Sequence, residues 1–123
     1  MTPTAKRQAF RLGHLAETLC LWYLRLKGYR ILAQRFRVPA GEIDLIARRG
    51  ALLVAIEVKA RADLASAAEA ISHRQRRRVA RALDYFLATR PDLAGLSRRF
   101  DVMLVVPRRL PRHLIDAWQS ELH

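Results

Sequence analysis

Three residues near the middle of the chain have the types and spacing that phosphodiester hydrolysis can use. Asp44 is followed thirteen residues later by Glu57, and Lys59 comes two positions after Glu57. Two neighbouring carboxylates can hold a hard divalent cation such as Mg²⁺, which prefers oxygen ligands. An adjacent ammonium can orient or help deprotonate a metal-bound water and offset charge on a phosphate. The alternative is a charged surface hairpin in which Lys59 merely neutralises Glu57.

Whether these side chains meet depends on a predicted hairpin. Residues 42–48 and 52–60 alternate apolar and mixed positions, which predicts two antiparallel strands around Arg49-Gly50-Ala51. A turn at Gly50-Ala51 would be of type II′ and would place Asp44 opposite Glu57, whereas a turn at Arg49-Gly50 would make them diagonal neighbours. Both turns keep the two acids and the amine on one face. A three-residue loop would reverse Asp44, and the apolar pattern argues against it.

The elements around the hairpin predict an α/β domain. They are a helix over 12–27 ended by Gly28, a strand over 29–38, a helix over 68–89 capped by Ser66 or Ser72, a strand over 99–106 and an edge strand over 113–118. This order predicts a central mixed β-sheet flanked by helices. Residues 1–11 are expected to form a loose basic lead-in, and residues 12–123 a single domain.

Composition restricts the class of protein. Hydrophobic residues make up 51% of the 123 residues, which is enough for a packed core. No apolar run approaches about 18 residues, so no membrane span is expected. The N-terminus lacks an apolar stretch behind its charges, which favours a cytoplasmic protein. A single cysteine, Cys20, excludes an internal disulfide and is expected to be a buried thiol.

The charge favours a polyanionic partner. Lys and Arg total 23 against 11 acidic residues, a net charge of +12, and such a field recruits nucleic acid. An anionic membrane is the weaker choice, because no predicted basic helix carries an exposed aromatic face. We expect Trp22 and Trp118 to pack in the core or at an edge. The scattered histidines, among them His113, are expected on the surface.

An arginine stripe lies on the second predicted helix. Arg74, Arg77, Arg78 and Arg81 are spaced to share one helical face. A phosphate backbone would relieve the repulsion between these charges. The alternative is a solvated arginine-rich face with no partner.

Two motifs resemble the signature of a known family. Residues 41–46, GEIDLI, followed by residues 56–61, IEVKAR, resemble the paired motifs of the YraN-like family. That uncharacterised family belongs to the restriction-endonuclease-like, or PD-(D/E)xK, nucleases and is similar to archaeal Holliday-junction resolvases. Supporting segments are LGHLAE at 12–17, LKGYRIL at 26–32 and RFDV at 99–102. Two departures are Leu64-Ala65, where the family has an aromatic-glycine pair, and Arg74, where it has lysine.

The resemblance implies a restriction-endonuclease-like fold and a Mg²⁺- or Mn²⁺-dependent endonuclease acting on structured or branched DNA, with a homodimer possible. Asp44, Glu57, the carbonyl of Val58 and Glu17 would bind or orient the metal, and Lys59 would be the catalytic lysine. Glu42 is not a motif acid and is expected to pair with an arginine. Nucleic acid would be bound by Arg61, Arg74, Arg77, Arg78 and Arg81. The competing hypotheses are a non-catalytic DNA- or RNA-binding module and a scaffold for a protein partner.

Overall fold

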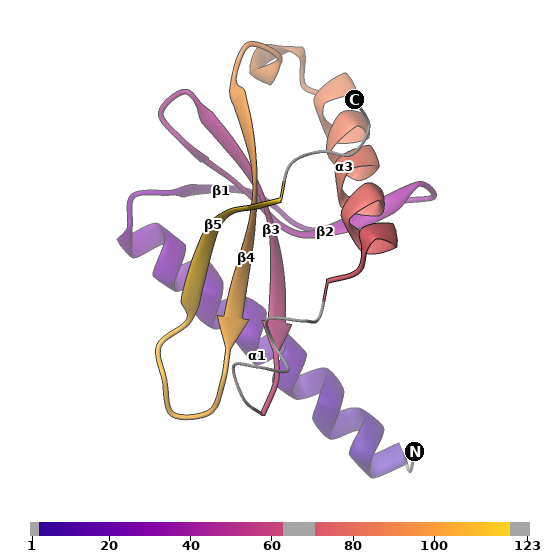
Figure 1. Ribbon diagram of the computed structural model, residues 1–123, viewed down its shortest axis with the longest axis vertical. Coiled ribbons are helices and arrows are strands. Elements are labelled where there is room, and N and C mark those ends of the chain that lie inside the picture. The colour runs from indigo at the N-terminus through magenta and orange to yellow at the C-terminus, as the bar shows by residue number, and fades with distance from the viewer. Residues whose placement is uncertain (1–2, 63–70, 119–123) are drawn as a thin grey trace.

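The computed structural model describes residues 3–62 and 71–118, which form five strands, two α-helices and one short 3₁₀ helix (Figure 1). Leu64-Ala65, Ser66 and the predicted helical residues 68–70 lie outside the described residues. In chain order the elements are α1 Pro3–Leu26, β1 Arg30–Val38, β2 Gly41–Arg49, β3 Leu52–Ala60, α3 His73–Ala88, the 3₁₀ helix Pro91–Leu93, β4 Ser97–Val105 and β5 Arg112–Trp118. The predicted order of helix, three strands, helix and two strands is confirmed.

The strands form one mixed sheet in which spatial order follows chain order, β1-β2-β3-β4-β5. Neighbours are antiparallel except β3 and β4, which are parallel. Parallel strands need a long crossover connection, and α3 lies in the connection between these two strands. The predicted central mixed sheet flanked by helices is therefore confirmed.

The two long helices cover opposite faces of the sheet (Figure 1). Alternate residues of β3 divide between these faces, because successive side chains of a strand point in opposite directions. Leu53 and Ala55 belong to the cluster that α3 covers. Val54 and Ile56 belong to the cluster that α1 covers through Cys20, Leu21 and Leu24. Cys20 is buried, as expected, and burial is the main cause that raises the pKa of its thiol to about 12.

The central hairpin has the turn that places Asp44 opposite Glu57. Arg49 pairs with Leu52 and Leu45 pairs with Ile56, so the turn residues are Gly50 and Ala51. Gly50 has φ +61°, whereas Ala51 is not among the residues with positive φ, as a type II′ turn requires. The diagonal register and the three-residue loop are both excluded.

Two helix starts differ from the sequence prediction. The first helix begins at Pro3, so most of the segment expected to be a loose lead-in is helical. Proline suits the first turn of a helix, and residues 4–11 contain neither Gly nor a further Pro. The second helix begins at His73 rather than at residue 68, because the Ser72 hydroxyl accepts the N–H of Gln75 and caps the helix there.

For two residues, the predicted burial or exposure of the side chain was wrong. Trp22 is 57% exposed on α1 instead of packing in the core, so a basic helix with an exposed aromatic side chain does exist. The side chain of His113 is only 3% exposed, instead of lying on the surface. Trp118, by contrast, is buried and stacks on Phe100 as predicted, with ring centroids 5.4 Å apart. Among the described residues, no helix has both the length and the apolar character that a membrane crossing needs.

Candidate functional site

The two motif acids lie where β2 separates from β3. The pairing between these strands extends to Leu45 and Ile56, and the next positions in that register are Asp44 and Glu57. Side chains continue the connection there. The N–H of Val58 donates to Oδ2 of Asp44 at 2.8 Å, and the N–H of Asp44 donates to Oε1 of Glu57 at 3.4 Å. The structure thus brings together the two carboxylates that the spacing singled out.

Glu57 is held from the opposite side by the second helix. Its side chain follows Ala55 on the sheet face that α3 covers, and the residue is 3% exposed. Nε2 of Gln75 donates to Oε2 of Glu57 at 3.1 Å. Ser72 fixes Gln75 in the first turn of α3 by accepting its backbone N–H. Gln75 therefore positions one of the two acids.

Sequence reasoning missed the role of Gln75, although a signal was present. Ser72 and Gln75 have the spacing of a capping box, which identifies a helix start. That motif turns the glutamine back to the cap residue's own N–H. In the structure the Gln75 amide donates to Glu57 instead. Only the packing of the helix on the sheet could reveal this contact.

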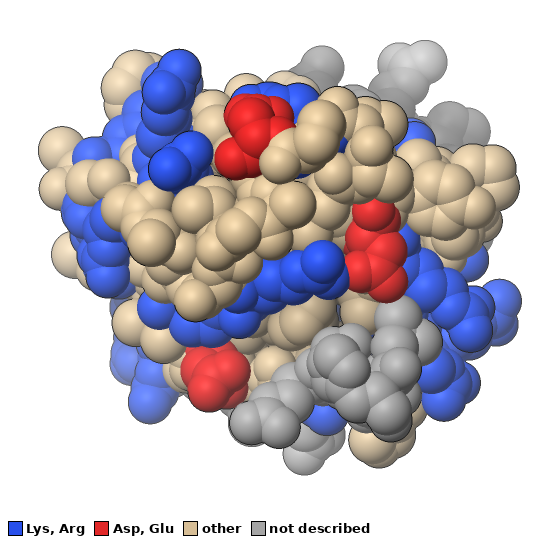
Figure 2. All heavy atoms as spheres, turned by 90° about the horizontal axis from the view of Figure 1, so that it is seen from above, with Lys and Arg blue, Asp and Glu red and all other residues tan. Residues whose placement is uncertain are grey.

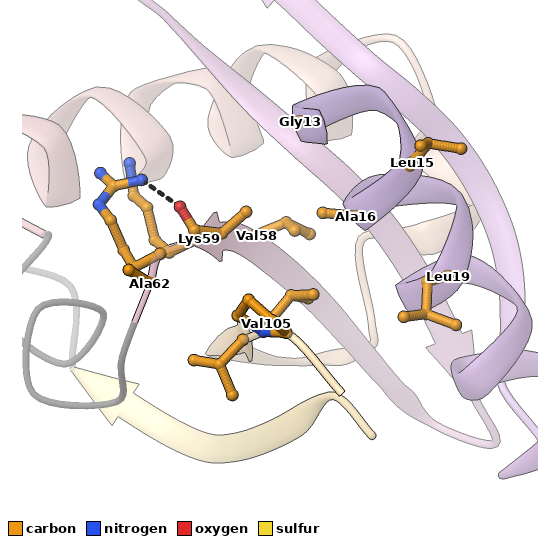
Figure 3. Close-up of a pocket in the computed structure, with 12 residues that line it drawn as sticks. Gly13, Leu15, Ala16, Leu19, Val58, Lys59, Ala62 and Val105 are labelled. Atoms are coloured by element: carbon orange, nitrogen blue, oxygen red, sulfur yellow. Dashed lines mark hydrogen bonds between the residues drawn. The ribbon is translucent and has the colours of Figure 1, made fainter. Parts of the chain in front are cut away.

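Lys59 lies beside the acids and lines a cleft. It is half-buried, and its charge acts to lower the pKa of both Asp44 and Glu57. The cleft has a volume of about 710 Å³ and lies between α1 and the ends of β3 and β4. Figure 3 shows Leu15, Ala16 and Leu19 of α1 near Val58 and Lys59 of β3. The predicted catalytic amine is thus accessible to a ligand in this cleft.

Burial and repulsion by neighbouring carboxylates raise the pKa of both acids: Glu17 and Glu42 act on Asp44, and Asp44 acts on Glu57. Burial is the largest cause, raising the pKa of Asp44 to about 6 and that of Glu57 to about 8. The negative charge of Asp44 raises the pKa of Glu57 further, while Lys59 and the hydrogen bonds partly offset these effects. The two groups share a site that disfavours two negative charges unless a cation neutralises them.

The oxygen atoms at this site suit a hard divalent cation. Among the described residues, no hydrogen bond is recorded to Oδ1 of Asp44. The N–H of Val58 donates to Asp44, and the Val58 carbonyl points to the same side of β3 as this N–H. Two carboxylates, one carbonyl and several waters match the way Mg²⁺ binds. The described part of the chain contains no group of three or more His, Cys, Asp or Glu side chains that could hold a metal by themselves.

Glu17 lies near the acid pair but is held by a different partner. Its charge raises the pKa of Asp44, which places the two groups within electrostatic range. Its Oε2 accepts a hydrogen bond of 2.8 Å from Nε of Arg35, and Arg35 also contacts His14. Glu17 thus acts on Asp44 through its charge, and its role toward a metal stays a prediction.

Exposed arginines lie on α3 and at the cleft, and they are not confined to one patch. On α3, Arg74, Arg77 and Arg81 are exposed and Arg78 is half-buried. Arg61 is exposed at the cleft and donates from Nη1 to the Ala60 carbonyl at 2.8 Å (Figure 3). Figure 2 looks onto the opposite end of the molecule, away from the cleft, and Lys and Arg are spread over that end as well. The predicted stripe is therefore part of a wider basic surface.

Glu42 and Arg37 form the predicted structural pair. Nε of Arg37 lies 3.3 Å from Oε2 of Glu42, and both side chains are more than half exposed. Glu42 is therefore an exposed residue paired with an arginine, as expected, and it acts on the acid site only through its charge, which raises the pKa of Asp44.

A second buried carboxylate, Asp101, is fully used within the fold. Arg99 donates to both of its oxygens at 2.8 Å, His113 lies 2.6 Å from Oδ2, and the N–H of Asp116 donates to Oδ1 at 2.9 Å. Burial acts to raise the pKa of Asp101, but these hydrogen bonds outweigh it and hold the pKa below its usual value. These contacts account for the burial of His113, whose Nδ1 also lies 2.7 Å from Nζ of Lys27.

Comparison with known proteins gives one consistent family. The uncharacterised protein family UPF0102 matches residues 16–105. A UPF0102 protein of Parvibaculum lavamentivorans is 55% identical over 117 residues, covering 95% of this chain and 88% of the relative. UPF0102 proteins of a Chelativorans species and of Agrobacterium fabrum are 53% and 51% identical, covering 94% and 92% of this chain and 94% and 93% of their own lengths. On this match, which contains both acid motifs, the chain belongs to the UPF0102 family.

Proposed function

We propose that this protein is a Mg²⁺- or Mn²⁺-dependent endonuclease with a restriction-endonuclease-like fold, acting in the cytoplasm on structured or branched DNA. The observation that carries the proposal is the desolvated pair of Asp44 and Glu57 beside Lys59. Burying two acids together is unfavourable, and a fold retains such a pair most readily when a cation and an anionic substrate complete it. The net charge of +12 supplies the attraction for that substrate.

Each residue has a distinct role in the proposed site. Asp44, Glu57 and the Val58 carbonyl would hold the cation, which when bound supplies Lewis-acid activation of a water and a phosphate oxygen. Lys59 would donate a hydrogen bond to the phosphate or to the attacking water, offsetting the charge that develops on the phosphate. Gln75 keeps Glu57 in one orientation. Glu17 would orient the site from α1, and Arg35 sets the direction of its carboxylate.

The arginine surface would hold the nucleic-acid backbone. Arg61 at the cleft and the exposed arginines of α3 offer contacts to phosphates, which position a duplex without reading its sequence. A branched substrate with two-fold symmetry would be matched by two such sites, so the proposal includes a homodimer.

The test is cleavage of labelled junction, flap and linear DNA in Mg²⁺ and in Mn²⁺. The wild-type protein should cleave structured substrates, and Asp44→Asn and Glu57→Gln should each lower the rate by at least about a hundredfold. Both substitutions keep the shape of the side chain. If the wild type does not cleave, or if both variants cleave as fast as the wild type, the proposal of an endonuclease is wrong.

A non-catalytic nucleic-acid-binding module is the second candidate, favoured by the basic surface. This module predicts salt-sensitive binding that is unaffected by Asp44→Asn and Glu57→Gln, with no cleavage. The double variant Arg77→Glu and Arg78→Glu tests binding in either case. Unchanged affinity in that variant would contradict a role for the α3 stripe.

A further inference from the structure

The face of α1 that is turned away from the sheet carries an exposed apolar stripe, and the first two members of the stripe, Leu15 and Leu19, also line the cleft beside Lys59. The stripe consists of Leu15, Leu19, Trp22 and Leu26, which are 64%, 43%, 57% and 86% exposed. The opposite face of the helix is already buried on the sheet through Cys20 and its neighbours. A helix that is apolar on both faces is typical of one packed on both sides.

The stripe is concentrated in a way that isolated surface leucines are not. The described residues leave three other large hydrophobic side chains exposed, Tyr85, Leu110 and Ile115, and none of these lies on α1. An uninterrupted apolar patch of four large side chains is on the scale of the largest patches of monomeric proteins, about 300–600 Å². Such patches commonly mark interaction sites.

The spacing of the stripe favours a second copy of the same helix. Successive members are separated by four, three and four residues, so the pattern is the same when it is read from either end. This is also the alternation of the apolar seam of a coiled coil. An antiparallel pair related by a two-fold axis would place Leu15 against Leu26 and Leu19 against Trp22. A surface that matches itself under a two-fold rotation is what an isologous interface needs.

The flanks of the stripe permit this approach despite the high positive charge of the whole molecule. In the antiparallel arrangement, the exposed Thr18 would face the exposed Arg25 of the other copy. The other two flanking positions are Tyr23 and Ala16, and Ala16 is buried on its own sheet. No two like charges are opposed at these positions. Arg25 stacks over its own Trp22 ring at 4.9 Å, and Glu17 is engaged with Arg35.

We propose that the Leu15, Leu19, Trp22 and Leu26 stripe is the interface of an antiparallel α1–α1 homodimer. The interface specifies the dimer named in the proposed function, but it rests on the stripe alone. Its test measures mass and chain geometry rather than cleavage, so either proposal can fail without the other.

The first experiment measures the molar mass of the full chain by analytical ultracentrifugation over a micromolar concentration series. The wild type should approach twice 14.1 kDa, and the dimer fraction should rise with salt because salt screens the repulsion between two +12 molecules. Trp22→Glu and Leu26→Glu should each give monomers with unchanged circular dichroism. Leu110→Glu, at a residue 75% exposed outside the stripe, is the matched control and should remain dimeric.

The second experiment tests the orientation with cysteines in a Cys20→Ala background. Leu15→Cys mixed with a tagged Leu26→Cys should form a mixed disulfide, because antiparallel helices bring these positions together. Leu26→Cys alone should not cross-link, since its two copies would be about 16 Å apart along the helix axis and a disulfide needs Cα atoms within about 7 Å. The reverse result would establish a parallel pair and overturn the antiparallel interface.

Two further outcomes would overturn the proposal. A monomer at every concentration and salt would exclude the interface. The same result accompanied by Trp22-dependent pelleting with phosphatidylserine vesicles, weakening as salt rises, would assign the stripe to an anionic membrane surface.

Discussion

Glu57, which is buried, and Asp44, which is half-buried, form a pair of acids whose charges are unfavourable for stability where they lie. Within residues 3–62 and 71–118, neither carboxylate accepts a hydrogen bond from a cationic group; the donors are backbone N–H groups and the Gln75 amide. Neutral donors satisfy part of the lone-pair capacity but do not cancel two charges in a desolvated site. Asp101 differs from this pair, because Arg99 already neutralises its charge; the proposed cation would do the same for Asp44 and Glu57.

The first prediction concerns stability against pH in the absence of metal. Burial raises the folded pKa of Asp44 to about 6 and of Glu57 to about 8, from ordinary values of 3.8 and 4.5. Between these limits the folded state binds more protons than the unfolded chain, so stability falls as the pH rises from about 4 to about 8. Urea denaturation with a chelator should show this fall.

The matched variant for that experiment is Glu57→Gln, which removes the acid with the greater shift. It should be more stable than the wild type at pH 8, by on the order of 1–3 kcal/mol, and nearly equal to it at pH 4. Mg²⁺ should stabilise the wild type at pH 8 and have a smaller effect on the variant. A pH-independent difference between the two proteins would contradict the shifted pKa of Glu57.

A second residue-scale prediction concerns Gln75. Gln75→Ala removes the donor to Glu57 and should lower the cleavage rate constant about tenfold, with little change in KM for DNA, because a hydrogen bond to a charged group contributes about 1.5–3 kcal/mol. Gln75→Glu should lower the cleavage rate constant further than Gln75→Ala does, since it adds a negative charge beside Glu57. Equal losses in rate and in thermal stability, with no effect on the metal dependence, would indicate a merely structural residue.

At the scale of elements, the site depends on how closely β2 and α3 approach. Gly41 begins β2, and a Cβ built on it would lie 2.0 Å from the Arg78 carbonyl oxygen. Only glycine permits this contact, which brings the start of the Asp44 strand against the helix that carries Gln75. The arginine stripe and the acid pair are connected through the same helix, so the position of α3 decides both.

The prediction at this scale compares two glycines. Gly41→Ala should destabilise the protein by more than about 2 kcal/mol, because backbone atoms would have to move. Gly13→Ala should instead stabilise it by about 0.5–1 kcal/mol, since Gly13 is helical and a Cβ there meets nothing within 4 Å. Equal effects in chemical denaturation would show that the contact at Gly41 yields easily.

For the molecule as a whole, the relevant property is the excess of 23 basic over 11 acidic residues. Some arginines are internally engaged, for instance Arg99 with Asp101 and Arg98 with Asp84 at 2.7 Å. The exposed arginines of α3 and of the cleft contribute to the external field. Long-range attraction of this kind raises association rates and weakens as salt is added.

The corresponding prediction is a steep salt dependence of DNA binding. A plot of log affinity against log salt concentration should be linear, and Arg74→Ala together with Arg81→Ala should reduce its slope by up to about two phosphate contacts. Arg90→Ala, which removes an exposed arginine already paired with Asp92, is the control and should leave the slope nearly unchanged. A slope insensitive to both changes would place the nucleic acid elsewhere.

The strands, their order along the chain and the two acids that meet could be predicted from the amino-acid sequence. Alternation of apolar residues in 42–48 and 52–60 is a local property, and Gly50 restricts the turn, so the opposition of Asp44 and Glu57 could be anticipated as one of two close registers. Helix starts were less certain, because Ser66 and Ser72 are equally good caps by residue type. The first helix was predicted too short, since charged helix formers at 4–11 show no apolar period.

Contacts between side chains of different elements could not be predicted from the sequence and became known only from the packed fold. The donation of Gln75 to Glu57, the engagement of Glu17 by Arg35 and the burial of His113 against Asp101 all join segments distant in the chain. The exposure of Trp22 could not be predicted from the sequence either, because α1 is apolar on two faces and the sheet covers only one of them. Local sequence fixes backbone direction through short-range sterics and periodicity, whereas these contacts and pKa shifts depend on packing and desolvation, which arise only once the layers are assembled.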